Sequence, residues 1–165
     1  MIDKKYRLVV ALPLLFLLGC GGAPVPKETS QNMKPESNTT KNPLLEEFDT
    51  PFGVPPFEKI DDDHYLAAIQ AAIDSHKGEI EKIAIQDATP SFENTIAALD
   101  FSGNLLTKVV LVFFAKAAAD TNDQVQEIEK EVAPLLSAHS DAIKMNPDLF
   151  GRLKDVYEKR EALTL

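Results

Sequence analysis

The feature that most constrains this chain is the longest helical pattern in its 165 residues, which begins at Pro90. Thr89 can cap it, and Pro90 takes the first helical position, where a missing backbone N–H costs nothing. A helix that is apolar nearly all round is usually central, so we predict one long central helix over residues 90–119. Gly103, midway, costs about 1 kcal/mol inside a helix relative to alanine and indicates a bend or a close helix contact. The apolar residues are Phe92, Ile96, Leu99, Leu106, Val109, Val110, Leu111, Val112, Phe113, Phe114 and Ala117.

Three further helices are predicted, one before this segment and two after it, which makes the fold all-α with about four helices. Any of the aspartates at 61–63 can cap a first helix, which should fade near residues 86–88. A capping box at Thr121-Asn122-Asp123-Gln124 opens a third helix, and Pro134 should kink or divide it. Asn146 and Pro147 open a fourth. The apolar stripes that support these helices are Leu66, Ile69, Ile73, Ile80 and Ile83; Val125, Ile128, Val132, Leu135, Leu136 and Ile143; and Leu149, Phe150, Leu153, Val156 and Tyr157.

The three histidines do not form a recognisable metal-binding or catalytic pattern. No histidine stands four residues from another, and none has an acidic residue at the spacing of a zinc site. His64 and His76 flank the first apolar stripe, so we expect them at the surface or at an interface. His139 falls on the apolar side of its helix, so we expect it to be partly buried and hydrogen-bonded. The sequence therefore predicts no catalytic residue and no metal ligand.

Residues 43–60 form a segment rich in proline and aromatic residues, in which a regular helix is not expected. Its large apolar residues are too many for a simple linker. We expect an extended strap that lies across the helices and buries these side chains between them. A contact with an aromatic ligand or a peptide is the functional alternative. The apolar side chains in question are Phe48, Phe52, Val54 and Phe57.

The N-terminus resembles a bacterial lipoprotein signal peptide. Three basic residues precede an apolar run from Leu8 to Leu18, which is too short for a membrane span of about 20 residues. The run ends in Gly19-Cys20, as in a lipobox, so residues 1–19 would be removed and Cys20 would be lipidated. Several acyl chains on one residue give stable anchoring to a membrane. Gly21 after the cysteine favours the outer membrane, facing the periplasm. An ordinary signal peptide with an incidental cysteine is the alternative.

Residues 20–42 are predicted to be a disordered tether, because they contain almost no large apolar side chains. The formal net charge of the chain is −9. Without the first 19 residues, which hold three basic residues and one acidic residue, it is −11. Nucleic-acid binding requires a basic face, and none is present. The predicted organisation is thus a signal peptide, a tether, the strap and a helical lobe over residues 61–165.

Several stretches of the chain together resemble the N-terminal region of the thimet-oligopeptidase-like zinc metallopeptidases, in their bacterial peptidyl-dipeptidase and oligopeptidase A branch. The resemblance runs in register from about residue 42 to residue 165. Asp100 and Glu58 depart from it, at positions where glutamate and aspartate, respectively, are common. The matching stretches are Asn42-Pro43-Leu44-Leu45, residues 50–57, residues 90–103, the Pro134 to His139 segment and the helix start at 146–150.

The resemblance implies a two-lobed helical enzyme with a deep channel that admits short peptides. Its zinc would be bound by His-Glu-x-x-His on one helix, where two histidines hold the metal and the glutamate activates water. This sequence lacks that motif, since His64, His76 and His139 are followed by tyrosine, lysine and serine. No catalytic residue, metal ligand or zinc is therefore assigned to the chain itself.

Two functional hypotheses remain open. In the first, the chain is an N-terminal fragment of a lipid-anchored peptidyl-dipeptidase, inactive without the catalytic region; no stop signal precedes Leu165, so the last helix is expected to be cut off. In the second, it is a stand-alone helical periplasmic lipoprotein that serves as a binding or scaffold module.

Overall fold

The computed structural model describes residues 41–162, which form an all-α unit without a strand in that range. The predicted all-α class is confirmed. The predicted signal peptide (1–19), Cys20 and nearly all of the tether (20–42) lie outside the described residues. The long helices are α1 (Asp62–Ile85), α3 (Asn104–Ala119), α4 (Asp123–Lys144) and α5 (Pro147–Glu158). The short elements are η1 (Pro43–Leu45), η2 (Pro51–Gly53), η3 (Phe57–Lys59), η4 (Phe92–Ala97), α2 (Ala98–Asp100) and η5 (Arg160–Ala162).

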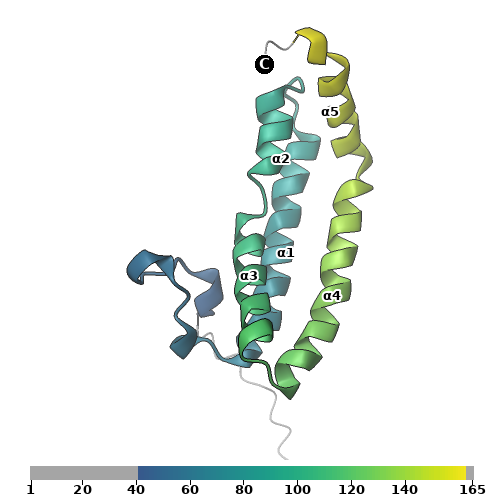
Figure 1. Cartoon of the computed structure of the whole chain (residues 1–165). Helices are drawn as coiled ribbons and strands as arrows, with labels where there is room; N and C mark the ends of the chain where they lie inside the picture. Colours follow the sequence, from purple (N-terminus) through teal and green to yellow (C-terminus); the bar gives the residue numbers. More distant parts are fainter. Residues whose placement is uncertain (1–40, 163–165) are drawn as a thin grey trace, which may run out of the picture. The chain divides into compact units, whose positions relative to one another are not determined.

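Helix α1 is the centre of the bundle, because α3, α4 and α5 all pack against it (Figure 1). It buries eight residues, whereas α3 buries three. The prediction that the 90–119 segment is the central helix is therefore wrong: α3 packs against α1 through one face only. Two apolar clusters fill the bundle. The larger consists of Leu44, Tyr65, Ala68, Ile69, Ala72, Ile73, Val109, Val112, Phe113, Val125, Ile128 and Val132, and the smaller of Ile80, Ile83, Ala84 and Leu149.

The outer face of α3 leaves apolar side chains in solvent. Leu111 is 66% exposed and Phe114 is 38% exposed. By length and apolar composition alone, Phe92–Ala119 could cross a membrane, with a mean hydropathy of 1.6 in its most apolar window. Helices of a bundle core pass the same test, and this segment is broken at Gly103 and contributes Phe113 to the core. We therefore describe it as a bundle element.

The 90–119 segment is divided rather than continuous. It begins after Ser91, whose hydroxyl accepts from the Asn94 N–H, so Thr89 and Pro90 are not its cap and first residue. One π-helical turn leads into α2, and the chain then breaks at Gly103, which has a φ of +72°. A Cβ at Gly103 would lie 2.7–2.9 Å from the His76 ring. The predicted bend and close contact at this glycine are confirmed.

Helix α4 is continuous across Pro134. Pro134 and Lys130 are both exposed, so water can reach the Lys130 carbonyl, which the proline deprives of its usual partner. Of the two predicted effects of Pro134, division of the helix is therefore wrong, and a kink stays a prediction. The cap lies one residue later than predicted, at Asn122 instead of Thr121, since Asn122 accepts from the Val125 N–H at 2.9 Å. At α5, Asn146 caps as predicted and accepts from the Asp148 and Leu149 N–H groups.

The strap differs most from its prediction. Phe52, Val54 and Phe57 are 105%, 52% and 45% exposed, so these side chains are not buried between helices. Phe52 has a φ of +62°, which turns the chain sharply at η2 and directs its side chain into solvent. The segment is held instead by buried Leu44 and by Lys108, whose Nζ lies 4.6 Å from the centre of the Phe48 ring.

Candidate functional site

The structure joins two histidines that are 63 residues apart in the sequence. His139 Nε2 on α4 lies 3.0 Å from His76 Nδ1 on α1, and their rings meet edge to face. His76 Nε2 lies 3.0 Å from the Ser102 hydroxyl, next to the break at Gly103. His139 is buried and hydrogen-bonded, as predicted, whereas its pairing with His76 had no signal in the sequence.

The hydrogen positions in this cluster follow from one bond. The Ser102 hydroxyl donates to the Leu99 carbonyl at 2.7 Å, so it acts as an acceptor towards His76 Nε2–H. A neutral His76 then accepts at Nδ1, and His139 donates from Nε2. The remaining nitrogen, His139 Nδ1, is buried without a hydrogen-bond partner. Burial is the main reason that the pKa of His139 is lowered, and His76 adds to the effect.

The order serine, histidine, histidine does not make a nucleophile here. The Ser102 hydrogen is directed to a helix carbonyl, away from His76. The Gly103 N–H, which could otherwise stabilise an oxyanion, donates to Glu79 Oε2 at 2.8 Å. A pocket of about 310 Å³ beside His139 is lined by Lys77 and Glu81 but does not include Ser102. The cluster connects α1, α4 and the α2–α3 break, and this is a structural role.

The described residues do not fit the zinc that the family resemblance implies. Within residues 41–162, no group of three or more His, Cys, Asp or Glu side chains could hold a metal ion. The facing nitrogens of His76 and His139 are hydrogen-bonded to each other. At the start of α1, His64 Nδ1 already accepts a hydrogen bond from the Asp61 N–H. Cys20, the predicted lipidation site, lies outside the described residues.

A second buried polar cluster was missed entirely at the sequence level. The Arg152 guanidinium of α5 donates to the carbonyls of Gln86 and Ala88 at 3.0 Å and to Asn94 Oδ1 at 2.9 Å. Arg152 is only 7% exposed. Asn94 Oδ1 also accepts from the Ser91 N–H, and Asn94 Nδ2 donates to the Thr89 carbonyl. The Phe92-to-Ile96 stretch is thus the point where α5 is fastened to the loop after α1.

Glu93, the carboxylate in that stretch, has no neighbour with which it could act as a base. Its side chain is exposed, and its pKa is lowered by hydrogen bonding from its own backbone N–H and from Ser91. A base poised for proton transfer near neutral pH would have a raised pKa instead. Glu93 therefore serves the start of the helix.

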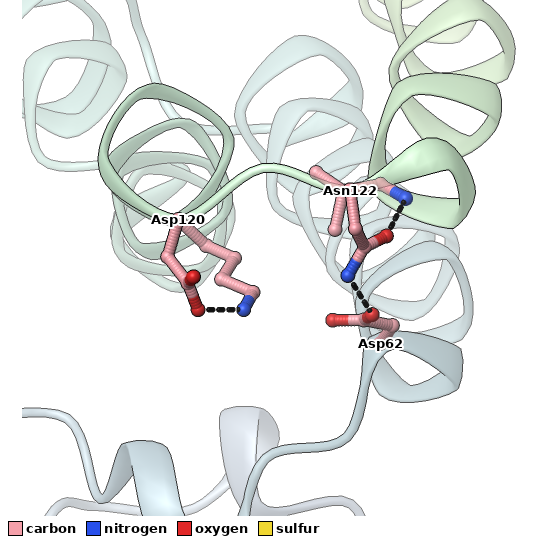
Figure 2. A network of polar contacts seen from close by, with 5 residues as sticks. Asp62, Asp120 and Asn122 are labelled. Atoms are coloured by element: carbon pink, nitrogen blue, oxygen red, sulfur yellow. Dashed lines mark hydrogen bonds and ion pairs between the residues drawn. The ribbon is translucent and has the colours of Figure 1, made fainter.

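An apolar recess lies between the strap and the end of α3. Its volume is about 440 Å³, and its walls are Phe57, Ile60, Tyr65, Ala115, Lys116, Ala119 and Asp120. At this end of the bundle Lys116 pairs with Asp120, and Asn122 Nδ2 donates to Asp62 at 2.7 Å. Figure 2 shows Asp62, Asp120 and Asn122 in this polar network. Burial raises the pKa of Tyr65, and the Asp120 carboxylate raises the pKa of Lys116. Because Lys116 is paired, the recess offers an apolar surface without a free cation.

These observations define the class of the chain: an all-α unit whose family-like landmarks fasten helices to one another. Comparison with known proteins confirms the resemblance, because curated homologues belong to the thimet-oligopeptidase family. No family model matches the chain. It is 39% identical over 127 residues to the dipeptidyl carboxypeptidase of Escherichia coli (strain K12), and 40% identical over 124 residues to that of Salmonella typhimurium. It is 26% identical over 124 residues to oligopeptidase A of Escherichia coli.

The match covers 75–77% of this chain but only 18–19% of each relative. The chain thus spans less than one fifth of the curated relatives that it matches. A match of this size is consistent with a single region of a peptidase, as the sequence predicted.

Proposed function

We propose that this chain is the N-terminal helical region of a zinc peptidase of the dipeptidyl carboxypeptidase type. In this proposal the region forms one wall of the channel that admits short peptides, and the catalytic residues belong to the remaining part of the enzyme. The 39% identity over 127 residues, confined to 19% of the relative, is the observation that carries the proposal.

The packing of the described residues supports this role. The stretches that mark the family resemblance fasten helices to one another: Asn94 binds Arg152, and Gly103 lies against His76. Large apolar side chains remain exposed on several elements, as expected for a region that is covered by further protein in the whole enzyme. They include Phe52, Val54 and Phe57 of the strap, Leu111 and Phe114 of α3, and Phe150 and Tyr157 of α5.

The chain by itself is proposed not to hydrolyse peptides. The 165 residues contain no His-Glu-x-x-His, so the zinc of the family and the water that it activates belong to the missing region. Zinc analysis of the purified chain should give no stoichiometric metal. One tightly bound zinc per chain would overturn this part of the proposal.

We also propose a place in the cell. Removal of residues 1–19 and acylation of Cys20 would anchor the region in a bacterial membrane, with Gly21 directing it to the outer membrane facing the periplasm. The tether would hold the helical unit about 25 Å from the anchor on average. Mass spectrometry of the envelope-bound protein should find acyl chains on Cys20. A free thiol on a soluble chain would contradict the proposal.

Complementation tests the main proposal. The dipeptidyl carboxypeptidase of Escherichia coli is produced without the region that matches this chain, and the chain is added in trans. We expect the truncated enzyme to release little C-terminal dipeptide and the added chain to restore part of the activity. A chain carrying Phe113→Ala, which removes a core side chain, is the control and should restore less. No binding and no recovery with a folded native chain would refute the proposal.

A stand-alone lipoprotein that binds or scaffolds a partner is the second candidate. It is favoured by one observation: the described helices close an apolar cluster of twelve buried residues on their own. A sharp two-state thermal transition of the chain alone would support this candidate, whereas a broad transition would support a region that depends on the rest of an enzyme.

A further inference from the structure

Within residues 41–162, the His76–His139 pair brings ionisable side chains from two helices into direct contact. Its hydrogen bonds run in one direction, from His139 to His76, to Ser102 and to the Leu99 carbonyl. Each hydrogen of this relay has an acceptor, and the one unpaired position, His139 Nδ1, is a buried acceptor. The relay is therefore complete only when both rings are neutral.

We propose that the His76–His139 hydrogen bond is an acid-sensitive latch, which holds α4 against α1 and the α2–α3 break near neutral pH and is released on acidification. This inference is independent of the proposed peptidase origin. It rests on the contact between rings from two helices and on the neutral tautomers that the contact requires.

An added proton has no favourable place in the latch. If His139 is protonated, its Nδ1–H is buried without an acceptor. If His76 is protonated, both of its nitrogens donate, and His139 must then accept at Nε2. In that case the single hydrogen of the neutral His139 ring leaves Nε2 for Nδ1, which is the same buried atom without an acceptor. Both routes place an unsatisfied N–H in the interior, which costs about 1–3 kcal/mol.

Of the charged groups around the pair, the Asp74 carboxylate raises the pKa of His139, but Lys77 has the larger effect and lowers it. On α1, Lys77 pairs with Asp74 at 3.0 Å, and Glu79 accepts from the Gly103 N–H. The α2–α3 break presents Ser102 and Gly103 to the pair, and neither is ionisable. The pocket beside His139 is lined by Glu81 of α1 and Asp148 of α5, whereas His139 Nδ1 itself is sealed from solvent.

The sign of the pH effect follows from the lowered pKa of His139. The unfolded chain takes up a proton near the ordinary histidine pKa of about 6.5, and the folded chain takes it up only at lower pH. Stability is therefore full above about pH 6.5 and is lost as the pH falls below that value. Carboxylates titrate mainly below pH 5, so the interval between pH 7.5 and 5.5 isolates the histidines.

Denaturant unfolding of the full chain between pH 7.5 and pH 5.5 tests the latch. In the native chain we expect the folding equilibrium constant to fall below pH 6.5, with a limiting slope of about tenfold per pH unit for one proton. His139→Gln keeps a donor at the position of Nε2 and cannot be protonated, so its folding constant should be nearly flat. His64→Gln is the control for a histidine outside the pair, whose Nδ1 accepts from the Asp61 N–H; a loss of slope as large as in His139→Gln would overturn the latch. A flat native profile, or a native slope in His139→Gln, would overturn the latch.

Nitrogen-15 NMR of the imidazoles of the native chain provides a test that needs no variant. At pH 7.5 we expect the hydrogen of His139 on Nε2 and an unprotonated Nδ1. Amide protection in α4 around His139 should decrease on acidification to pH 5.5 more than protection at Phe113 in α3. A hydrogen on Nδ1 at pH 7.5, or equal changes in the two helices, would refute the proposal.

Discussion

The two ends of the bundle are stabilised in different ways. At the end near the strap, twelve buried apolar residues join α1, α3 and α4. At the end near α5, the apolar cluster has only four buried residues, and two buried polar clusters complete the packing. These are the His76–His139–Ser102 relay and the contact of Arg152 with Asn94 and two carbonyls.

The difference shows at which end of the bundle side chains can be substituted and at which end particular side chains are required. Apolar contacts accept any side chain of suitable volume. Buried hydrogen bonds need donors and acceptors in fixed places, and an orphaned group costs about 1–3 kcal/mol. Conservative substitutions should therefore be milder near the strap than near α5, while truncation of a large apolar side chain should be worst near the strap.

The largest effect is expected from Phe113→Ala in the apolar end. Phe113 is fully buried and lies 5.4 Å from the Tyr65 ring centre. Its truncation should lower the free energy of unfolding by about 3–5 kcal/mol. Phe114→Ala, at the partly exposed neighbour, is the control and should cost about 1 kcal/mol or less. Denaturant unfolding measures both; equal losses would show that the buried and exposed faces of α3 are wrongly assigned.

Gly103→Ala should destabilise the break between the two ends by about 2–4 kcal/mol. The left-handed conformation costs an alanine about 1–2 kcal/mol, and contact of its Cβ with the His76 ring adds a steric cost of similar size. Gly78→Ala is a matched control, because a Cβ at this helical glycine meets nothing within 4 Å. That variant should be neutral or more stable. Thermal unfolding at pH 7.5 compares the two, and an unchanged Tm for Gly103→Ala would contradict the described contact.

Arg152→Met should cost about 2–3 kcal/mol at the polar end, although methionine retains much of the buried volume. The loss comes from the carbonyls of Gln86 and Ala88 and from Asn94, which lose a charged donor. Arg160→Met, at an exposed arginine, should change stability by less than about 0.5 kcal/mol. If methionine at 152 were tolerated as well as at 160, the polar end would not depend on this arginine.

The smallest effect is expected from Phe52→Asn in the strap. Phe52 makes no buried contact, and its positive φ is a conformation that asparagine adopts more easily. We expect the variant to be neutral or more stable by up to about 1 kcal/mol in denaturant unfolding. Leu44→Ala, at a fully buried residue of the same strap, should lose about 2–5 kcal/mol. A large loss for Phe52→Asn would restore the prediction that the strap aromatics are buried.

The sequence was sufficient to predict α1, α4 and α5 because their apolar residues recur with the helical period, whereas the helix predicted over residues 90–119 is divided. It also predicted the cap at Asn146 and the bend at Gly103, because both features depend on residues that are close in the sequence. It failed at Phe52 and Phe57, because apolar character alone does not reveal whether a partner surface faces the side chain. The predicted division of the helix at Pro134 was also wrong, because water can reach the exposed Lys130 there and the helix continues.

The polar clusters could not be predicted for a different reason. His76 and His139 are 63 residues apart, and Arg152 and Asn94 are 58 residues apart. Which residues meet at such separations depends on how α4 and α5 pack on α1, and no local pattern encodes this. His139 could be placed in the interior from its helical face, whereas Arg152 lies at a position where an exposed charge is the usual expectation.

The hydrogen bonds of Asn94 limit which residues can replace it. Its amide oxygen accepts three hydrogen bonds, from Ser91, Thr95 and Arg152, while its nitrogen donates to Thr89. Aspartate would match the arginine but could not donate, and glutamine would carry the same amide one methylene too far. A side chain can thus be nearly irreplaceable because of the number and position of its bonds, although it takes no part in any reaction.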